Sequence, residues 1–394
     1  MKDKEIEKLI KKETKRQKGV INLIPSENYV SKDVLTALGS IFDNKYSEGY
    51  PHKRYYGGNT FTDELEILCQ KRARKTFKLS EKVWHVNVQP HSGSPANLAV
   101  YLGLVPLGGK IMGMTLTAGG HLTHGQKVSL IGKAWQQVSY GVDPKTERID
   151  YKTLKGLAMK EKPNLIVAGF TAYPREINFK KFREIADACG AFLMVDMSHF
   201  AGLVAGGVYD SPFKYADVVT TTTHKTLRGP RSAIIFSRKD KKLGDKDISV
   251  LIDKAIFPGL QGGPHMSQIA SVAVALAEAA RPDFKKYARQ ILKNSRALAS
   301  ELARLGWRIV SGGTDSNLLL VDTWMDGKGI PGKEAEAKLE KAGIICNKNT
   351  IPGETRSPFD PSGIRLGPPA ETTRGKKEKD MVKIARKIDR ILRA

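Results

Sequence analysis

Residues 164–196, NLIVAGFTAYPREINFKKFREIADACGAFLMVD, decide the fold. Two short apolar runs, Asn164–Phe170 and Ala191–Val195, flank the segment Phe179–Cys189, whose apolar side chains recur at helical spacing and which Gly190 ends. The stretch therefore predicts a strand, a helix and a second strand. At this spacing the helix crosses over in a right-handed sense between parallel strands, so we expect an α/β fold whose mostly parallel sheet is covered by helices on both faces.

The same alternation continues on both sides of this stretch. Further apolar or β-branched runs predict strands at Lys110–Met114, Ala216–Thr223 and Ala233–Phe236. Near residue 275 the pattern changes to long helices and short strands, predicted at Ser267–Ala280, Phe284–Leu305, Trp307–Val310 and Asn317–Val321. We expect an N-terminal arm (1–25), a large α/β domain (26–275) and a small C-terminal α/β domain (276–394).

The composition is typical of a globular protein, with 40% hydrophobic and 27% charged residues among 394. No apolar run reaches the ~20 residues that span a bilayer, and residues 1–18 lack the apolar core of a secretory signal. The three cysteines, Cys69, Cys189 and Cys346, are far apart and odd in number, which disfavours a disulfide framework or a zinc ribbon. We expect a cytoplasmic protein with no membrane association and no metal site.

The charge balance is unusual, with 65 Lys and Arg against 41 Asp and Glu and a net charge of +24. Residues 1–20, 281–308 and 371–394 together carry +15 of this charge. These stretches resemble surface helices and contain few aromatic residues that would read bases. A solvated basic surface is therefore favoured over a dedicated nucleic-acid site, and we expect only weak, salt-dependent binding of nucleic acid.

Two ionisable residues follow neighbouring predicted strands, where ligands of open parallel sheets usually bind. Asp196 ends the run FLMV, and Lys225 ends the run VVTTTTH. A carboxylate and an amine at one sheet edge are what pyridoxal 5'-phosphate (PLP) chemistry requires, because the amine forms an imine with the cofactor aldehyde and the carboxylate keeps the pyridine nitrogen protonated. Position alone leaves an exposed lysine and a capping or turn aspartate as equal alternatives.

Longer motifs favour the PLP interpretation. The string VVTTTTHKTLRGPR (218–231) resembles the active-site segment of the serine hydroxymethyltransferase family, PLP-dependent enzymes of fold type I. Other family-like segments follow in family order over nearly the whole chain: PSENY (25–29), NKYSEGYPHKRYYGG (44–58), NVQPHSGSPAN (87–97), GGHLTHG (119–125), VDMSHFAGLVAGGVY (195–209), FPGLQGGP (257–264), SGGTDSNLLLVD (311–322) and SGIRLGPPA (362–370).

The resemblance implies roles for the residues around the cofactor. Lys225 would be the Schiff-base lysine, Asp196 the partner of the pyridine nitrogen and His121 the residue stacked on the ring. The other implied cofactor-binding residues are Ser92, Gly93 and Ser94 as a phosphate cradle, Thr171 and His199 on the phenolic side, and His224 beside the lysine. Tyr46, Gly262 and Gly263 would reach the phosphate from a second subunit, which implies a homodimer with shared active sites, and a tetramer stays open.

The resemblance also implies the substrate contacts. Arg365 would hold the amino-acid carboxylate, since its planar fork suits a bidentate pair, with Ser26 and Tyr56 as accessory contacts. Glu48 would be the acid/base at the substrate hydroxyl and the folate, and a buried glutamate with a raised pKa is expected there. The implied folate-binding residues are Glu48, Tyr55, Leu116, Gly120, His121, Leu122, Asn349, Ser357, Pro358 and Phe359.

Some positions depart from the family pattern without removing a catalytic group. Thr171 stands where serine is usual, Phe200 replaces a smaller aliphatic residue, and His52 occupies a position often held by glycine. Changes at His52 and Phe200 bear on pocket shape, so the folate type and the side substrates follow less directly from the resemblance than the reaction does.

The implied function is transfer of the serine hydroxymethyl carbon to tetrahydrofolate, which gives glycine and 5,10-methylenetetrahydrofolate. One alternative is a folate-independent aldolase of the same fold that cleaves threonine-like amino acids, and the folate-type residues at Glu48, Tyr55 and 349–359 favour the first interpretation. A second alternative, suggested by the net charge, is a PLP-fold protein with added RNA binding.

Overall fold

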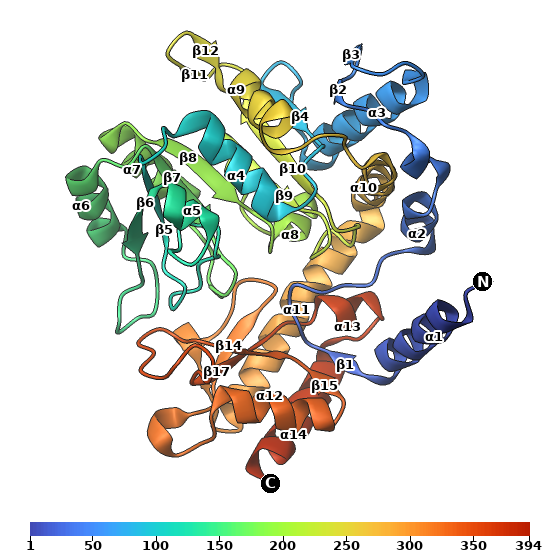
Figure 1. The fold of residues 1–394 in the computed structure, drawn as a ribbon. Helices are drawn as coiled ribbons and strands as arrows, with labels where there is room; N and C mark the ends of the chain where they lie inside the picture. Colours follow the sequence, from blue (N-terminus) through green and yellow to red (C-terminus); the bar gives the residue numbers. More distant parts are fainter.

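A central sheet of seven strands forms the larger part of the molecule (Figure 1). The computed structural model describes residues 1–394. The strand order is β4-β10-β9-β8-β7-β5-β6, and only β10 runs antiparallel to its neighbours. The strands are β4 (Trp84–Asn87), β5 (Lys110–Met114), β6 (Gln136–Tyr140), β7 (Leu165–Gly169), β8 (Phe192–Asp196), β9 (Val218–Thr222) and β10 (Ala233–Arg238). The mostly parallel α/β sheet predicted from residues 164–196 is therefore confirmed.

Both faces of this sheet are buried, as the continuous apolar strands predict. Successive residues of β7 alternate between two cores, with Leu165 and Val167 in one and Ile166 and Ala168 in the other. The first core includes α4 (Gly93–Leu104) and α9 (Ile248–Lys254), while α3 (Thr60–Phe77), α7 (Phe179–Cys189), α8 (Ala201–Ala205) and α10 (Met266–Ala279) contribute to the second. Smaller elements surround the sheet: α2 (Lys32–Leu38), β2 (Gly49–Tyr50), β3 (Lys53–Arg54), α5 (Leu130–Ala134), α6 (Tyr151–Glu161), β11 (Lys242–Leu243) and β12 (Lys246–Asp247).

A smaller antiparallel sheet forms the second part of the molecule, with the order β13-β14-β17-β16. The elements of this part are β13 (Arg308–Ile309), β14 (Leu319–Asp322), α12 (Gly332–Lys341), β15 (Ile344–Ile345), β16 (Asn347–Asn349), β17 (Gly363–Leu366), α13 (Pro369–Thr373) and α14 (Glu378–Arg393). The strands predicted at Trp307–Val310 and Asn317–Val321 are present, although β13 is shorter and β14 begins two residues later.

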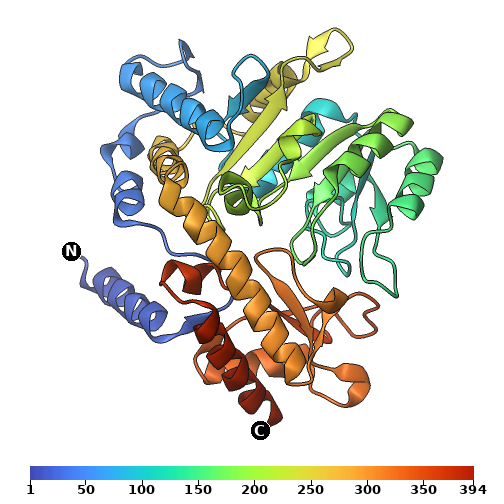
Figure 2. The same ribbon diagram turned by 180° about the vertical axis from the view of Figure 1, so that it is seen from behind.

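One long helix, α11 (Pro282–Arg304), joins the two parts (Figure 2). Phe284 and Ile291 at its start belong to a core of the large sheet, while Leu298 and Leu302 near its end belong to the core of the small sheet. A continuous helix that contributes to both cores couples the two parts mechanically. The boundaries placed at residues 25 and 275 stay a prediction.

The N-terminal segment lies outside both layers. Helix α1 (Lys4–Gly19) has no buried residue and projects from the body (Figure 1). The short strand β1 (Ile21–Asn22) then pairs in parallel with β15, and Leu23 enters the core of the small sheet. The arm is thus anchored on the small sheet just before residue 25. None of the helices is both long enough and apolar enough to cross a membrane.

Candidate active site

A cavity of about 250 Å³ lies at the carboxyl ends of β7, β8 and β9. Because these parallel strands end at one sheet edge, residues far apart in the sequence meet there. The cavity brings together the predicted residues Ser92, Gly93, Ser94, His121, Thr171, Asp196, His199, His224 and Lys225. The other lining residues are Asn97, Phe170, Ser198, Thr222 and Arg231.

Asp196, the last residue of β8, is buried and held by three hydrogen bonds. Its Oδ2 accepts from Nδ2 of Asn97 at 2.9 Å and contacts Nε2 of His124 at 3.2 Å, and its Oδ1 accepts from the N–H of Ser198 at 3.0 Å. Burial opposes the charged form, but these donors, His124 foremost, outweigh it and hold the pKa of Asp196 well below its usual value. Asp196 is therefore an ionised carboxylate in the lining of the cavity.

The hydrogen bonds also define the tautomer of His124, a residue that the sequence analysis did not single out. Its Nδ1 accepts from the N–H of His121 at 3.2 Å, so the ring proton is on Nε2 and points at Asp196. Nδ1 of His121 in turn accepts from the N–H of Thr123 at 3.1 Å. This turn can approach the sheet closely because Gly120 has no side chain, since a Cβ there would collide with the carbonyl of Met114.

Lys225 follows β9 and shares the cavity with Asp196. Its Nζ donates to Oγ1 of Thr222 at 2.8 Å. Burial lowers the pKa of Lys225 to about 8, with a smaller effect from the charges of Arg365 and Arg231, while Asp196 acts in the opposite direction. An appreciable fraction of this amine is consequently neutral, and hence nucleophilic, near neutral pH.

Three histidines line the cavity in the neutral form. Burial lowers the pKa of His121 to about 4 and that of His224 to about 3, and it places the pKa of His199 well below its usual value. Nδ1 of His199 and Nδ1 of His224 are buried without a hydrogen-bond partner. Unpaired buried nitrogens are costly in a folded protein, so they indicate a polar ligand in this cavity.

The turn Ser92-Gly93-Ser94 opens helix α4 beside the cavity. The hydroxyl of Ser92 makes no hydrogen bond to the helix start, so the first-turn N–H groups of α4 are not capped by that side chain. A Cβ on Gly93 would lie 2.7 Å from Cγ2 of Thr222, so only glycine fits there without a shift. Uncapped N–H groups and hydroxyls at a helix start suit a phosphate, and the cavity as a whole fits a phosphorylated pyridine aldehyde.

Arg365 of β17 is buried close to the cavity, beside Thr171. Its Nε donates to Oδ1 of Asn347 at 3.0 Å, and its Nη1 donates to the carbonyl oxygen of Thr171 at 2.7 Å. Burial lowers its pKa to about 10, which leaves the guanidinium charged at neutral pH. The small sheet thus presents a fixed cation to the large sheet, where a carboxylate ligand would pair with it.

Ser26 lines an adjoining cavity of about 400 Å³, to which helix α1 also contributes side chains. His224 and Arg231 line both cavities, so the two are neighbours. Nδ2 of Asn28 donates to the carbonyl oxygen of Lys225 at 3.0 Å, which ties the segment after β1 to the lysine.

Six other predicted residues lie close to one another, and none of them lines the cavity that holds Lys225. We call them the tyrosine–glutamate cluster: Tyr46, Glu48, Tyr55, Tyr56, Gly262 and Gly263. The rings of Tyr46 and Tyr56 are 5.1 Å apart. A Cβ on Gly262 would lie 3.1 Å from Oε1 of Glu48, and one on Gly263 would lie 3.5 Å from the ring of Tyr46.

Glu48 is less buried than the family resemblance implies. The resemblance implies a buried glutamate, whereas Glu48 is only half-buried in this chain. Its negative charge is close enough to raise the pKa of Tyr46. The acid/base role expected of Glu48 stays a prediction.

Apart from Glu48 and Tyr55 of the tyrosine–glutamate cluster, the predicted folate residues lie in two segments, one after β5 and one from the end of β16 to β17. Leu116, Gly120, His121 and Leu122 belong to the loop after β5, and the side chains of Leu116 and Leu122 are exposed. Asn349 ends β16, and Ser357, Pro358 and Phe359 are exposed in the loop that leads to β17 and Arg365. Exposed apolar side chains on loops beside a polar cavity suit a flat organic ligand.

Sequence reasoning missed the residues that hold the predicted ones in place. Asn97, His124, Thr222 and Arg231 all fall inside motifs that were quoted for other residues. A buried aspartate at the end of a strand stays ionised only if hydrogen-bond donors surround its carboxylate. That requirement could have directed a search for such donors in the quoted motifs.

The fold and the cavity together define a class of protein: a PLP-dependent enzyme of fold type I, with an amine, an ionised carboxylate and a phosphate-binding turn at one sheet edge. Comparison with protein families gives the particular family. The family model described as Serine hydroxymethyltransferase matches residues 1–388, so this chain belongs to the serine hydroxymethyltransferase family. It is an enzyme of the PLP-dependent glycine hydroxymethyltransferase type, and the family uses tetrahydrofolate as co-substrate.

Proposed function

We propose that this enzyme transfers the hydroxymethyl carbon of serine to tetrahydrofolate and releases glycine and 5,10-methylenetetrahydrofolate. The observation that carries the proposal is the single cavity that holds Lys225, ionised Asp196 and the turn Ser92-Gly93-Ser94. When bound there, PLP supplies an electron sink for the carbanion left by the departing hydroxymethyl group.

The residues of the large sheet would bind and orient the cofactor. Asp196 would hold a proton on the pyridine nitrogen, because its own pKa is far too low for it to keep that proton. Lys225 would attack the aldehyde carbon, and His121, neutral at physiological pH, would stack on the ring without adding charge. His199 and Thr171 would line the phenolic side, and the turn at Ser92–Ser94 would hold the phosphate.

Arg365 would orient serine by its carboxylate. Two of its nitrogens are already held by Asn347 and Thr171, so the guanidinium is preorganised and loses little freedom when it binds. A fixed carboxylate places the bond that breaks relative to the ring, and this placement is the larger share of what the protein contributes. Ser26, in the adjoining cavity, would assist from the N-terminal side.

Glu48 and its neighbours would complete the site of a second copy. No member of the tyrosine–glutamate cluster lines the cavity that holds Lys225 in the same chain, although these residues are expected at the phosphate, the substrate and the folate. Exposed apolar residues occur at the same end of the chain, with Ile41, Tyr55 and Phe61 at 84%, 76% and 73% exposure, as in an uncovered interface. A homodimer that exchanges these clusters would join both halves, with Glu48 delivering the proton at the substrate hydroxyl.

Complementation tests the shared site directly. Lys225→Ala removes the amine from one half of the site, and Glu48→Gln removes the acid from the other. In a homodimer with exchanged clusters, an equimolar mixture that has exchanged chains regains about a quarter of wild-type activity, because half the dimers contain one intact site. Recovery of no activity, with exchange shown by differently tagged chains, would rule out the shared site.

The reaction itself is tested by folate dependence. The reconstituted enzyme should form glycine from serine only when tetrahydrofolate is present, and Lys225→Ala should abolish this, whereas Lys180→Ala, an exposed lysine of α7, should not. Folate-independent cleavage of threonine-like amino acids, with no effect of folate on serine, would instead favour the aldolase.

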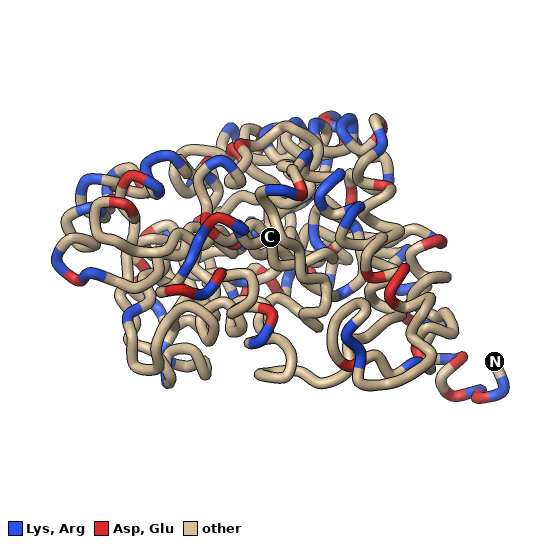
Figure 3. Tube along the Cα trace, turned by 90° about the horizontal axis from the view of Figure 1, so that it is seen from above, with Lys and Arg blue, Asp and Glu red and all other residues tan.

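Location and further partners also belong to this proposal. The three cysteines are unpaired, which is compatible with the reducing cytoplasm that we propose. Lys and Arg are spread along the chain with Asp and Glu among them (Figure 3), so binding of nucleic acid would be a weak polyelectrolyte effect.

A further inference from the structure

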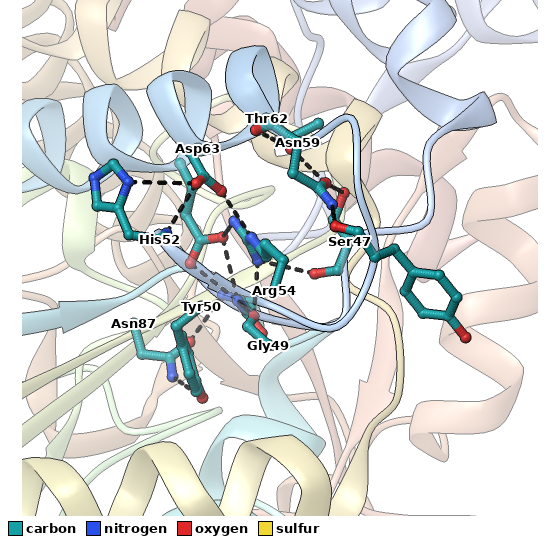
Figure 4. Close-up of polar contacts among 12 residues, drawn as sticks. Ser47, Gly49, Tyr50, His52, Arg54, Asn59, Thr62, Asp63 and Asn87 are labelled. Atoms are coloured by element: carbon teal, nitrogen blue, oxygen red, sulfur yellow. Dashed lines mark hydrogen bonds and ion pairs between the residues drawn. The ribbon is translucent and has the colours of Figure 1, made fainter.

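The loop that carries Glu48 is held by one buried arginine, Arg54 of β3. Nη1 of Arg54 donates to the carbonyl oxygens of Ser47 and Gly49, at 2.8 and 2.7 Å (Figure 4). These two residues flank Glu48, whose own carbonyl oxygen accepts from the N–H of Tyr55 at 3.1 Å. Three consecutive carbonyl groups are therefore fixed, and the backbone of Glu48 has little freedom to move.

Helix α3 anchors Arg54 from the other side. Nε of Arg54 donates to Oδ1 of Asp63 at 2.8 Å, and Nη2 donates to Oε2 of Glu66 at 2.7 Å. The side chains of Arg54 and Glu66 are 3% and 0% exposed, so water does not compete for these bonds. Because α3 packs against α10 and both helices contribute to the core of the large sheet, the arginine is attached to that core.

A glutamine connects this anchor to the glycine pair of the tyrosine–glutamate cluster. Nε2 of Gln89 donates to the carbonyl oxygen of Gly49 at 2.9 Å and to Oε1 of Glu66 at 3.0 Å. Nε2 of Gln261, the residue before Gly262, donates to the carbonyl oxygen of Gln89 at 2.9 Å. The Glu48 loop and the glycine pair are thus held in register by one buried network.

The shape of the loop requires this support. Gly49 has a φ of +92°, and a Cβ there would collide with the carbonyl of Lys53, so the chain turns sharply directly after Glu48. A buried ion pair is often no more stabilising than apolar packing, whereas a planar arginine with several fixed acceptors defines a geometry well. The arrangement is therefore better explained by the position it gives to Glu48 than by stability.

We propose that Arg54 is a positioning residue for Glu48, held for that purpose by Asp63 and Glu66 of α3. The inference rests on the proposed function, in which Glu48 handles the proton at the substrate hydroxyl. It implies that a substitution at Arg54 acts on catalysis through Glu48, with the cofactor, the serine carboxylate and the Lys225 cavity left as they are.

A double-mutant cycle with Glu48→Gln tests the inference. Arg54→Lys keeps the positive charge but replaces a planar guanidinium that makes four hydrogen bonds by a single ammonium group. Misplacement of a catalytic group by about 1 Å costs up to ~100-fold in rate. We expect a ~10- to 100-fold lower kcat for folate-dependent transfer, with KM for serine and PLP content within about twofold of wild type. The double variant should be no slower than Glu48→Gln alone, because Arg54 then has no acid left to position.

The matched control is Arg183→Lys. Like Arg54, Arg183 of α7 donates hydrogen bonds both to a buried aspartate, Asp217 at 2.7 Å, and to backbone carbonyl oxygens, but it lies away from the Glu48 loop. The Arg183→Lys variant should lose about as much thermal stability as Arg54→Lys and keep its kcat. If Arg54→Lys does not fold, Asp63→Asn retains an acceptor for Arg54 and should lower kcat by ~3- to 10-fold with KM unchanged.

The outcomes separate this inference from the proposed function. An inactive wild type would refute the function, and a fully active Glu48→Gln would refute the role of Glu48. If the wild type is active and Glu48→Gln is impaired, three results would overturn the positioning role of Arg54. These are a normal kcat in Arg54→Lys, losses of kcat that multiply in the double variant, and an equal loss of kcat in Arg183→Lys.

Discussion

Replacing Gly93 by alanine should close the phosphate turn while leaving the rest of the fold in place. The new Cβ would lie 2.7 Å from Cγ2 of Thr222, whereas carbon atoms pack best at ~3.5–4.0 Å, so one of the two groups must move by ~1 Å. Overpacking of this kind costs ~1–3 kcal/mol in the free energy of unfolding. Thr222 also accepts the hydrogen bond of Lys225, so the shift reaches the amine.

The effect on cofactor binding follows from the same displacement. A loss of ~1.4–2.8 kcal/mol in the fit of the phosphate corresponds to ~10- to 100-fold weaker binding of PLP. Fluorescence titration of the apoenzyme with PLP measures this constant, and urea unfolding of the apoenzyme measures the stability separately.

Gly156→Ala in α6 is the matched control. A Cβ there meets nothing within 4 Å, so alanine should stabilise the helix by ~0.5–1 kcal/mol and leave PLP affinity unchanged. If Gly93→Ala binds PLP as tightly as wild type, the turn at residues 92–94 does not hold the phosphate, and the reasoning from the uncapped helix start is wrong.

Further predictions concern charge and backbone strain. His124→Leu should lower the free energy of unfolding by ~1.5–3 kcal/mol at pH 7. Because the pKa of Asp196 is depressed in the folded protein, the difference in unfolding free energy between wild type and His124→Leu should shrink as the pH falls below ~4, which urea titrations at each pH measure. The rate at which the apoenzyme takes up PLP should rise with pH through about 8, the pKa of Lys225, and then level off; a rise centred near 10.5 would contradict the burial argument. His52 has a φ of +64° and an exposed side chain, so His52→Gly should raise the stability by ~1 kcal/mol or more in thermal unfolding, and a lower Tm would contradict the strain. Binding to single- or double-stranded nucleic acid should weaken steeply between 50 and 200 mM salt without sequence preference, and retention at high salt in a filter assay would indicate a dedicated site.

Much of the large sheet could be predicted because its signals are local. The run Asn164–Phe170, the stripe Phe179–Cys189 and the run Ala191–Val195 each encode one element, and the crossover rule then leaves one arrangement. The small sheet was predicted less completely, since β15 and β16 are two or three residues long and depend on pairing with distant partners, Ile21–Asn22 and Gly363–Leu366. Such short strands have no periodicity of their own.

The supporting residues of the site could not be predicted in the same way. Asn97 and His124 reach Asp196 from two distant segments, and the burial that makes their hydrogen bonds effective exists only after the chain has folded. Likewise, nothing in the order of residues 44–58 shows that Arg54 binds the carbonyls on both sides of Glu48, because those acceptors are backbone atoms that any sequence supplies.

The amino-acid sequence by itself determined the α/β class, the strand ends that carry Asp196 and Lys225, and the motifs that indicate the family. Each of these depends on residue types at short spacings. Only the tertiary structure decided that Lys225 is sufficiently buried to lower its pKa to about 8, and that no member of the tyrosine–glutamate cluster lines the cavity of its own chain. Desolvation and separation in space arise from contacts between distant segments, and a linear pattern contains no measure of either.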